Sequence, residues 1–295
     1  MPESPSPPDP EAILRRLEWT AVRRLDGLLH GDYRTLFRGF GLDLADLREY
    51  REGDDVRHID WNVTARLSTP YVREYHQDRD VAAWFLLDLS RSIDFGARVK
   101  KRALSAGFVT VLAQLLTRHG NRVGALLYGD RVESLPARSG RRHVLHLLHR
   151  LTRHSEASPR GTKLAELLGA AAPVLRRRSL VFVVSDFISE PGWEKPLGEL
   201  ARRHDVVAVR VRDPLESELP DMGMVTLEDP ETGEAVFIDT HDRGFRRRFA
   251  EMAATESTRI RDACAAGGID LLELSTDEPL LDALVRFARL RKEKR

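Results

Sequence analysis

The sequence predicts an α/β fold in which a mostly parallel sheet carries helices on both faces. Its apolar residues gather in short continuous runs, which is typical of strands that are buried on both sides of a sheet. Stretches with helical spacing of apolar residues separate most of these runs, and this alternation indicates parallel strands joined by right-handed crossovers. The runs occupy residues 81–87, 122–128, 180–184, 206–211 and 269–274.

The N-terminal part of the chain has a different pattern. Residues 1–10 are rich in Pro and Ser, which predicts a disordered tail, and they lack the basic start and apolar centre of a signal peptide. An amphipathic helix is predicted from Glu11 onward. Between residues 31 and 80, Gly, Pro and dense charge predict loops and short strands. We therefore expect an N-terminal helix and block at residues 11–80 and one larger domain at residues 81–291.

The larger domain is expected to contain two hairpins besides its parallel strands. A Gly-Asp turn at residues 129–130 predicts a hairpin between the second apolar run and residues 131–135. Residues 224–228 and 235–239 flank a turn with Pro and Gly, which predicts a hairpin insertion near residues 223–239. Helices are predicted at residues 97–119, 143–151, 164–176, 242–266 and 278–291.

The composition is that of an ordinary globular protein. Of 295 residues, 42% are hydrophobic and 32% are charged, so the chain can bury a sizeable core. Lys and Arg number 47 against 46 Asp and Glu, and the net charge of +1 gives no overall attraction to nucleic acid. No apolar run reaches the ~18 residues that a membrane span needs. We expect a soluble, cytoplasmic protein in which the single cysteine, Cys264, is a small core residue.

Chemistry is expected at the carboxyl ends of the strands, where open α/β sheets form their sites. The first apolar run ends in Asp88, with Ser90 and Ser92 on the next alternate positions, and the third run ends beside Asp186. Thr162 opens a predicted helix on the same side. Taken singly, each residue has a structural explanation, because Ser, Thr and Asp commonly cap helices or turn the chain. Their occurrence at one edge of the sheet favours a common site.

These side chains have the chemistry of a site for a hard cation. Carboxylates and hydroxyls offer only oxygen ligands, which suit Mg²⁺, Mn²⁺ or Ca²⁺ and disfavour Zn²⁺. The two carboxylates balance a divalent charge, whereas the hydroxyls are neutral. Mg²⁺ prefers about six ligands, so the protein groups leave at least one position open. The sequence therefore predicts a divalent-metal site that accepts one further anionic ligand.

The pattern Asp88-x-Ser90-x-Ser92, with Thr162 and Asp186, resembles the metal-ion-dependent adhesion site of von Willebrand factor A domains. The resemblance implies a von Willebrand factor A-like, or Rossmann-like, fold. It implies that the two serines and the threonine ligate the metal, and that the aspartates bind it directly or through water. It also implies that an acidic side chain of a partner or client protein completes the coordination.

A second group of motifs spreads over the chain and comprises GLD at 41–43, LREY at 47–50, GDDVRHIDW at 53–61, AR at 65–66, YVREY at 71–75 and EDPETGE at 228–234. These motifs are similar to a bacterial family, domain of unknown function fifty-eight, whose members often accompany MoxR-type AAA+ ATPases. The similarity covers nearly the whole chain, from about residue 31 to about residue 291. It implies a partnership with a MoxR-like ATPase in the maturation or remodelling of client proteins.

The densely charged segment at residues 41–75, called the signature block below, has two interpretations. Its charged side chains form either a partner surface or a network of ion pairs and caps that anchors the block to the sheet. Exposed ion pairs contribute only about 0–1 kcal/mol each, so stability alone explains this charge poorly. Trp61 is expected to be a packing anchor. The charged residues concerned are Asp54, Asp55, Arg57, Asp60 and Arg66.

The leading hypothesis is a non-enzymatic, metal-dependent protein-binding module that acts as an adaptor or co-chaperone, without a membrane span or a nucleic-acid partner. The sequence has no P-loop motif, so the chain is not expected to hydrolyse ATP itself. One alternative is a metal-dependent hydrolase, such as a nuclease or phosphatase, with His58 or Asp60 as the general base. Another is a structural scaffold whose metal site is empty.

Overall fold

The computed structural model describes most of the larger predicted domain and part of the signature block. The predicted tail at residues 1–10 and the helix predicted from Glu11 lie outside the described residues. The described residues are 46–51, 54, 56, 59, 61, 64–65, 69–74, 82–97, 99–118, 120–153, 162–228 and 235–293.

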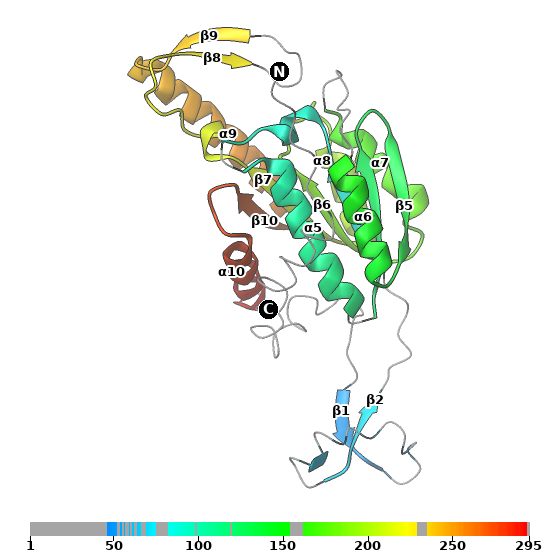
Figure 1. The fold of residues 1–295 in the computed structure, drawn as a ribbon. Coiled ribbons are helices and arrows are strands. Elements are labelled where there is room, and N and C mark those ends of the chain that lie inside the picture. The colour runs from blue at the N-terminus through cyan, green and yellow to red at the C-terminus, as the bar shows by residue number, and fades with distance from the viewer. Residues whose placement is uncertain are drawn as a thin grey trace, which may run out of the picture.

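A sheet of six strands forms the centre of the described structure (Figure 1). Its strand order is β10-β7-β6-β3-β4-β5, and neighbouring strands are parallel except for the antiparallel pair β4 and β5. This arrangement confirms the predicted mostly parallel sheet and the first predicted hairpin. The strands are β3 (Ala82–Asp88), β4 (Arg122–Tyr128), β5 (Val132–Arg138), β6 (Leu180–Ser185), β7 (Asp205–Arg212) and β10 (Asp270–Ser275).

Helices cover both faces of the sheet, as the sequence predicts. Buried side chains of α5, α6 and α10 form the core on one face, and those of α7, α8 and α9 form the core on the other face. Two short 3-10 helices, η3 and η4, follow β3 and β7. The bounds are η3 (Arg91–Asp94), α5 (Lys101–Arg118), α6 (Arg141–Arg153), α7 (Leu164–Val174), α8 (Glu194–Arg203), η4 (Pro214–Glu216), α9 (Arg243–Ala266) and α10 (Leu280–Glu293).

Alternation of side chains along β3 explains why the sheet has two cores. Ala83, Phe85 and Leu87 pack with α5 and α10 on one face. Trp84 and Leu86 pack with α7 and α8 on the other face. Every residue of β3 after its first is buried, as expected for a strand with neighbouring strands on both sides and helices on both faces.

The path of the chain creates a topological switch point at β3. From β3 the chain passes to β4 on one side, and after α7 it returns to β6 on the other side of β3. The carboxyl ends of β3 and β6 therefore lie side by side at one edge of the sheet. Open α/β sheets bind ligands in the crevice at such a point.

Two small antiparallel sheets lie outside the main sheet. β1 (Asp46–Glu49) pairs with β2 (Tyr71–Glu74), and β8 (Met224–Glu228) pairs with β9 (Ala235–Asp239). The first pair belongs to the predicted block of short strands. The second pair is the predicted hairpin insertion, which precedes α9 in the chain and lies beside it in Figure 1.

Helix α8 is the main element that is not predicted from the sequence. It contains Pro196 and Gly198, both of which lower helix propensity. Its only buried residues are Leu197 and Leu200, so the apolar stripe is short. Pro196 is tolerated because it lies in the first turn, where backbone N–H groups have no partner within the helix. The other predicted elements of the larger domain agree with the structure to within a few residues at each end.

Candidate metal centre

Asp88 is the last residue of β3 and lies at the topological switch point. Its side chain is 1% exposed, and both of its carboxylate oxygens accept hydrogen bonds. The backbone N–H of Ser90 donates to Oδ1 at 3.0 Å, and the hydroxyl of Ser185 donates to Oδ2 at 2.7 Å. These contacts fix the carboxylate at the edge of the sheet, and each oxygen keeps a second lone pair for a cation.

Ser90 and Ser92 lie on the turn that follows β3 and enters η3. Both are buried, and their hydroxyl oxygens are 3.0 Å apart. Ser90 is the N-cap residue of η3, but its hydroxyl makes no capping hydrogen bond, and Ser92 lies inside η3. Helix capping therefore does not explain the two serines, whose hydroxyls pair with each other next to Asp88.

Asp186 follows β6, the strand beside β3. It is 1% exposed, its Oδ1 accepts from the backbone N–H of Ile188 at 3.0 Å, and its Oδ2 accepts from Nζ of Lys101 at 2.7 Å. Phe187 has a φ of 62°, a left-handed conformation that costs a residue with a Cβ about 1–3 kcal/mol. Packing offsets this cost, because Phe187 is buried and its ring meets that of Trp193 edge-on with centroids 5.2 Å apart. The strained turn holds Asp186 at the sheet edge.

Thr162 lies directly before α7 and is 1% exposed. The N-cap residue of α7 is Lys163, so Thr162 lies one position before the start of the helix. The backbone N–H of Lys163 donates to the hydroxyl of Tyr128 at 3.2 Å, and the carbonyl of Thr162 accepts from the hydroxyl of Ser189 at 2.9 Å. Tyr128 is the strand partner of Asp88, and Ser189 belongs to the loop after β6. Thr162 is thus held between the ends of β4 and β6.

The electrostatics of the two aspartates favour a cation. Burial, and after it the negative charge of Asp186, raise the pKa of Asp88 from 3.8 to about 6, although hydrogen bonds from Ser90 and Ser185 act in the opposite direction. Repulsion between two buried carboxylates is relieved when one of them is protonated or when a cation binds between them. A divalent metal would supply positive charge at the place where this repulsion arises.

Two charged residues that the sequence analysis missed also lie at this edge. Lys101, the first residue of α5, is fully buried, and its ammonium group contacts both Asp186 and Glu216 of η4. Burial alone would lower the pKa of Lys101, but the two carboxylates raise it above its usual value. Burial raises the pKa of Glu216 in spite of the contact with Lys101. One ammonium group therefore contacts two carboxylates, the buried one of Asp186 and the partly exposed one of Glu216.

Each missed residue has a signal in the sequence. Lys101 falls on the same helical face as Leu104 and Phe108, and a lysine on an apolar stripe predicts a buried charge that needs a partner. Glu216 belongs to a capping box with Asp213, directly after a buried strand. The sequence does not reveal their contact, because 115 positions separate Lys101 from Glu216.

The donor set fits a hard divalent cation. Contacts in the structure bring Asp88, Ser90, Ser92 and Asp186 to one edge, and Thr162 is held beside them. Within the described residues, no group of three or more His, Cys, Asp or Glu side chains is arranged to hold a metal. That finding is compatible with a centre that has two carboxylates and takes its other ligands from hydroxyls, which are oxygen donors that Mg²⁺ accepts.

The structure describes little of the signature block. Asp54 accepts a hydrogen bond from the backbone N–H of Arg51 at 2.8 Å, which is a local turn contact. Trp61 is 68% exposed, so the expectation that it anchors packing is wrong, and this tryptophan among charged neighbours lies at the surface. A partner role for the block stays a prediction. Asp55, Arg57, Asp60, Arg66 and the candidate base His58 lie outside the described residues.

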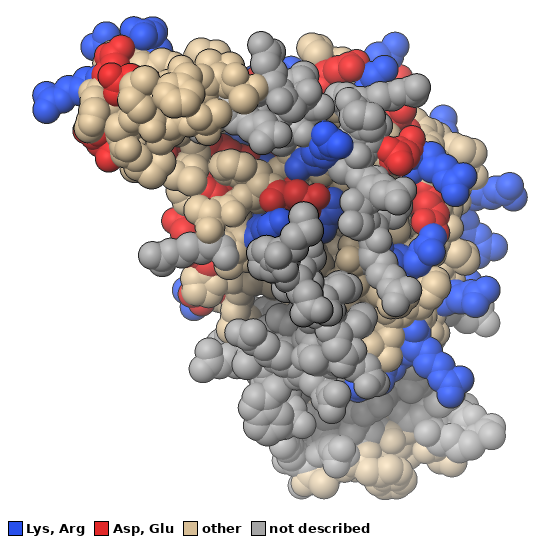
Figure 2. All heavy atoms as spheres, turned by 45° about the horizontal axis from the view of Figure 1, so that its top comes forward, with Lys and Arg blue, Asp and Glu red and all other residues tan. Residues whose placement is uncertain are grey.

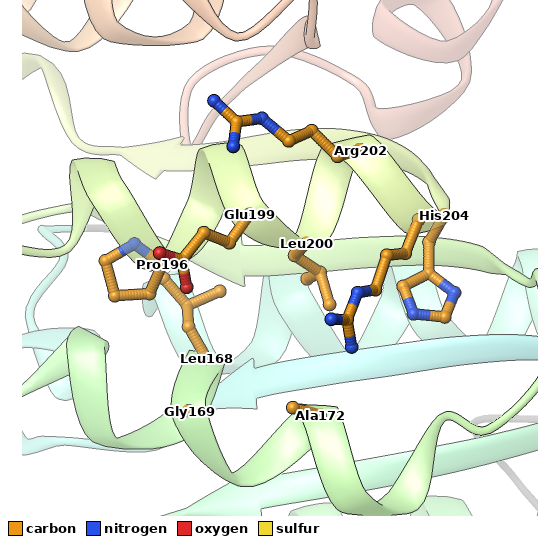
Figure 3. Close-up of a pocket in the computed structure, with 9 residues that line it drawn as sticks. Leu168, Gly169, Ala172, Pro196, Glu199, Leu200, Arg202 and His204 are labelled. Atoms are coloured by element: carbon orange, nitrogen blue, oxygen red, sulfur yellow. The ribbon is translucent and has the colours of Figure 1, made fainter.

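A groove of about 480 Å³ lies between α7 and α8 (Figure 3). His204 reaches it from the end of α8, next to the start of β7, so the groove lies toward the opposite end of the sheet from Asp88. Its charged lining residues include Arg202, Arg203 and Glu199, a set that suits an anion better than a metal ion. The groove is therefore separate from the candidate metal centre.

The surface around the candidate centre carries charges of both signs. Figure 2 brings the upper edge of Figure 1 forward and shows Lys and Arg interspersed with Asp and Glu among the described residues. On this face the described side chains form no continuous field of one sign. None of the described helices is long and apolar enough to cross a membrane.

Comparisons with known proteins found a relative in sequence and similar solved structures. The chain is 39% identical to uncharacterized protein Rv1480 of Mycobacterium tuberculosis over 285 residues, which cover 95% of this chain and 89% of that protein. Among solved structures, it is similar to BatB from Bacteroides thetaiotaomicron, with a TM-score of 0.46 and 15% identity over 72% of this chain and 99% of that chain. It is also similar to the VWA domain of SpRpn10, with a TM-score of 0.43 and 13% identity over 70% of this chain and 95% of that chain.

A family model covers most of the described structure. It is the model with the description "Protein of unknown function DUF58", and it matches residues 46–259. This range includes the candidate metal centre, the hairpin insertion and most of α9. Together with the identity to the mycobacterial relative, the match shows that the chain belongs to the DUF58 family.

Proposed function

We propose that this chain is a divalent-metal-dependent protein-binding module that uses its metal to bind an acidic side chain of a partner. The proposal rests above all on one observation, the meeting of two buried carboxylates with a pair of hydroxyls at the topological switch point. The negative charge of Asp186 adds to burial in raising the pKa of Asp88, and Ser90 and Ser92 offer neutral oxygens beside Asp88. Such a set of ligands suits a hard cation and leaves at least one of its coordination positions open.

The residues of the centre would have two different roles in metal binding. Asp88 and Asp186 supply the negative charge that holds the metal, directly or through water. Ser90, Ser92 and Thr162 supply neutral oxygens, so they add ligands without adding charge. Mg²⁺ in the first instance, or else Mn²⁺ or Ca²⁺, would supply an open coordination position beside these residues, which a carboxylate of the partner protein would fit.

The partner that we propose is a MoxR-type AAA+ ATPase, with this chain as its adaptor or co-chaperone in the cytoplasm. Support comes from membership of the DUF58 family and from the motif resemblance of the signature block. An adaptor of this kind would bind client proteins through the metal centre and the ATPase through another surface. The charged residues of the signature block are the candidates for that second surface.

Calorimetric titration with Mg²⁺ and Mn²⁺ tests the metal centre. We expect the wild type to bind metal and the double variant Ser90→Ala/Ser92→Ala to lose binding, because two of the neutral ligands are gone. Ser139→Ala is the matched control, since Ser139 is exposed after β5 and away from the centre. Equal binding by the wild type and the double variant would contradict the proposal.

Capture of the MoxR-type ATPase from the same organism tests the partnership, and capture of an acidic client segment tests metal-dependent binding. We expect Asp88→Ala to lose capture of an acidic client segment while it retains the fold. Capture that is unaffected by a chelator and by Asp88→Ala would contradict metal-dependent binding. Phosphatase and nuclease assays with Mg²⁺ or Mn²⁺ distinguish the hydrolase alternative, which requires metal-dependent turnover that Asp186→Ala abolishes.

A further inference from the structure

The buried Lys101 is a cation beside the proposed metal site and is not one of its ligands. Its side chain is fully buried, and its ammonium group lies 2.7 Å from Oδ2 of Asp186. A cation in contact with a candidate metal ligand competes with the metal for the same negative charge. Lysine is seldom buried to this degree without a specific partner. The contact between Lys101 and Asp186 should therefore weaken the binding of a metal at the centre.

Glu216 is positioned to control that competition. It belongs to η4, after β7, and it contacts the ammonium group of Lys101 from another segment than Asp186 does. Its other oxygen, Oε2, accepts from the backbone N–H of Asp213 at 3.0 Å, and Oδ1 of Asp213 accepts from the backbone N–H of Leu215 at 3.0 Å. This capping box holds Glu216 in place, so its charge is a fixed part of the site.

The side chains in this contact carry an excess of negative charge. When ionised, the carboxylates of Asp88, Asp186 and Glu216 outnumber the ammonium group of Lys101 by two charges, which is the charge of one divalent cation. Without metal, Asp186 pairs with the ammonium group of Lys101 at 2.7 Å. With metal, Asp186 has a second cation available and Lys101 retains Glu216.

We propose that Lys101 is the internal counter-ion of Asp186 in the metal-free protein, and that Lys101 and Glu216 together set the affinity of the centre for a divalent cation. Lys101 lowers that affinity because it places a positive charge on a metal ligand. Glu216 raises it because it draws the charge of Lys101 away from Asp186. This inference rests on the proposed function, since it concerns the same metal centre.

Single substitutions of Lys101 and of Glu216 should have opposite effects on the metal affinity. Lys101→Gln removes the competing cation, so Mg²⁺ and Mn²⁺ should bind more tightly, on the order of tenfold or more for the loss of one unit charge within a few ångströms. Glu216→Gln keeps the shape and the acceptor for Asp213 but removes the charge, so the same metals should bind more weakly by a similar factor. Lys101→Arg retains the charge and should bind metal much as the wild type does.

Calorimetric titration of the full chain, together with thermal unfolding in chelator and in Mg²⁺, measures these effects. Lys100→Gln is the matched control, because it removes the same charge from the neighbouring, exposed lysine and should leave the metal affinity unchanged. In chelator, Lys101→Gln should unfold at a lower temperature than the wild type, and Mg²⁺ should raise its Tm by more than it raises that of the wild type.

The outcomes separate this inference from the proposed function. If the wild type binds metal and Ser90→Ala/Ser92→Ala does not, but Lys101→Gln and Glu216→Gln bind like Lys100→Gln or both shift in one direction, the inference is wrong and the metal centre stands. If neither the wild type nor Lys101→Gln binds metal, both ideas fail. Should Lys101→Gln not fold, Glu216→Gln decides: weaker binding supports the inference, and unchanged or tighter binding overturns it.

Discussion

At the scale of single residues, Asp88 combines nearly complete burial with a charge. It is 1% exposed, and burial together with Asp186 raises its pKa to about 6. At neutral pH the carboxylate is therefore ionised in a place that favours its protonated form, which costs the metal-free folded state stability. A metal ion would remove this cost. The buried carboxylate of Asp88 therefore destabilises the metal-free protein and favours metal binding.

Asp88→Asn is expected to stabilise the metal-free protein at neutral pH and to abolish its response to Mg²⁺. Because the folded-state pKa of about 6 lies above the ordinary 3.8, the wild type loses stability as the pH rises between these values, and the loss persists at higher pH. Asparagine does not ionise, so the variant avoids a loss on the order of 3 kcal/mol. Urea unfolding in chelator, from about pH 4 to about pH 8, measures the difference.

The pH dependence distinguishes this explanation from a simple change in packing. The stability advantage of Asp88→Asn should grow up to about pH 6 and then stay constant. An advantage that does not change with pH, or a loss of stability at neutral pH, would contradict it. Asp130→Asn is the control, because Asp130 is exposed in the turn after β4 and should show neither effect.

The sequence predicted those candidate residues whose position follows from local pattern. Asp88 and Asp186 each end an apolar run, and Ser90 and Ser92 follow Asp88 at alternate positions, so the strand-end rule was enough to find them. Lys101 was not predicted, because its burial depends on partners that only the folded chain brings near. Long-range ion pairs of this kind have no local signature beyond a charge on an apolar face.

At the scale of elements, the pairing of β3 with β4 depends on a glycine. Trp84 is the strand partner of Gly124, and a Cβ built on Gly124 would lie 2.7–2.9 Å from three atoms of the Trp84 ring. The indole is part of a core with buried neighbours on β6 and α7, so it has little room to move. Gly124 therefore makes the close approach of the ring to the backbone possible.

Gly124→Ala is expected to lower the free energy of unfolding by about 1–3 kcal/mol, as other overpacked core sites do. Gly169→Ala is the matched control, since Gly169 is exposed on α7 and a Cβ there would meet nothing within 4 Å. That substitution should stabilise the protein by up to about 1 kcal/mol, because alanine has the higher helix propensity. Denaturant unfolding of both variants measures the contrast. Equal effects would show that contact with Trp84 does not limit the size of the side chain at position 124.

A buried threonine closes the base of the hairpin of β8 and β9. Thr240 is fully buried, and its hydroxyl accepts from the backbone N–H of Met222 at 2.9 Å and donates to the carbonyl of Gly223 at 2.7 Å. Phe237 on β9 is 69% exposed, so its ring contributes little to folding. The base of the hairpin, and not its strands, should therefore determine how the hairpin affects stability.

Thr240→Val is expected to cost about 1–3 kcal/mol, because it keeps the volume and removes a buried hydroxyl that two backbone groups use. Phe237→Ser should change stability by less than about 0.5 kcal/mol, as substitutions at exposed sites usually do. Thermal and urea unfolding of the two variants give the comparison. A larger loss for Phe237→Ser than for Thr240→Val would mean that the exposed ring packs against part of the chain.

Elements were predicted well where burial is continuous and poorly where it is sparse. β3, β6 and β7 are buried over nearly their whole length, and such apolar runs stand out in any sequence. Helix α8 buries only Leu197 and Leu200 and contains a proline and a glycine, so tertiary packing rather than propensity determines it. Sequence patterns therefore predict the buried strands of the sheet more reliably than a short helix at its surface.

At the scale of the whole molecule, the candidate centre joins segments that are far apart in the chain. Asp88 ends β3, Thr162 precedes α7 and Asp186 follows β6, and these are the segments around the switch point. The surrounding hydrogen bonds hold each segment in the metal-free protein, but they leave the two carboxylates in mutual repulsion. A ligand that binds only the assembled edge stabilises the entire fold, because the unfolded chain does not bring these residues together.

Mg²⁺ is therefore expected to raise the Tm of the wild type in proportion to the logarithm of its concentration, with about 2.7 kcal/mol of stabilisation at one hundred times Kd. The rise should shrink below about pH 6, because protons then compete with the metal for Asp88. Differential scanning fluorimetry with Mg²⁺ and with chelator measures the shift at each pH. Asp130→Asn should retain the full shift, since it changes an acidic residue at the same edge but outside the site. A shift of the same size in Ser90→Ala/Ser92→Ala would show that the metal stabilises the fold from some other place.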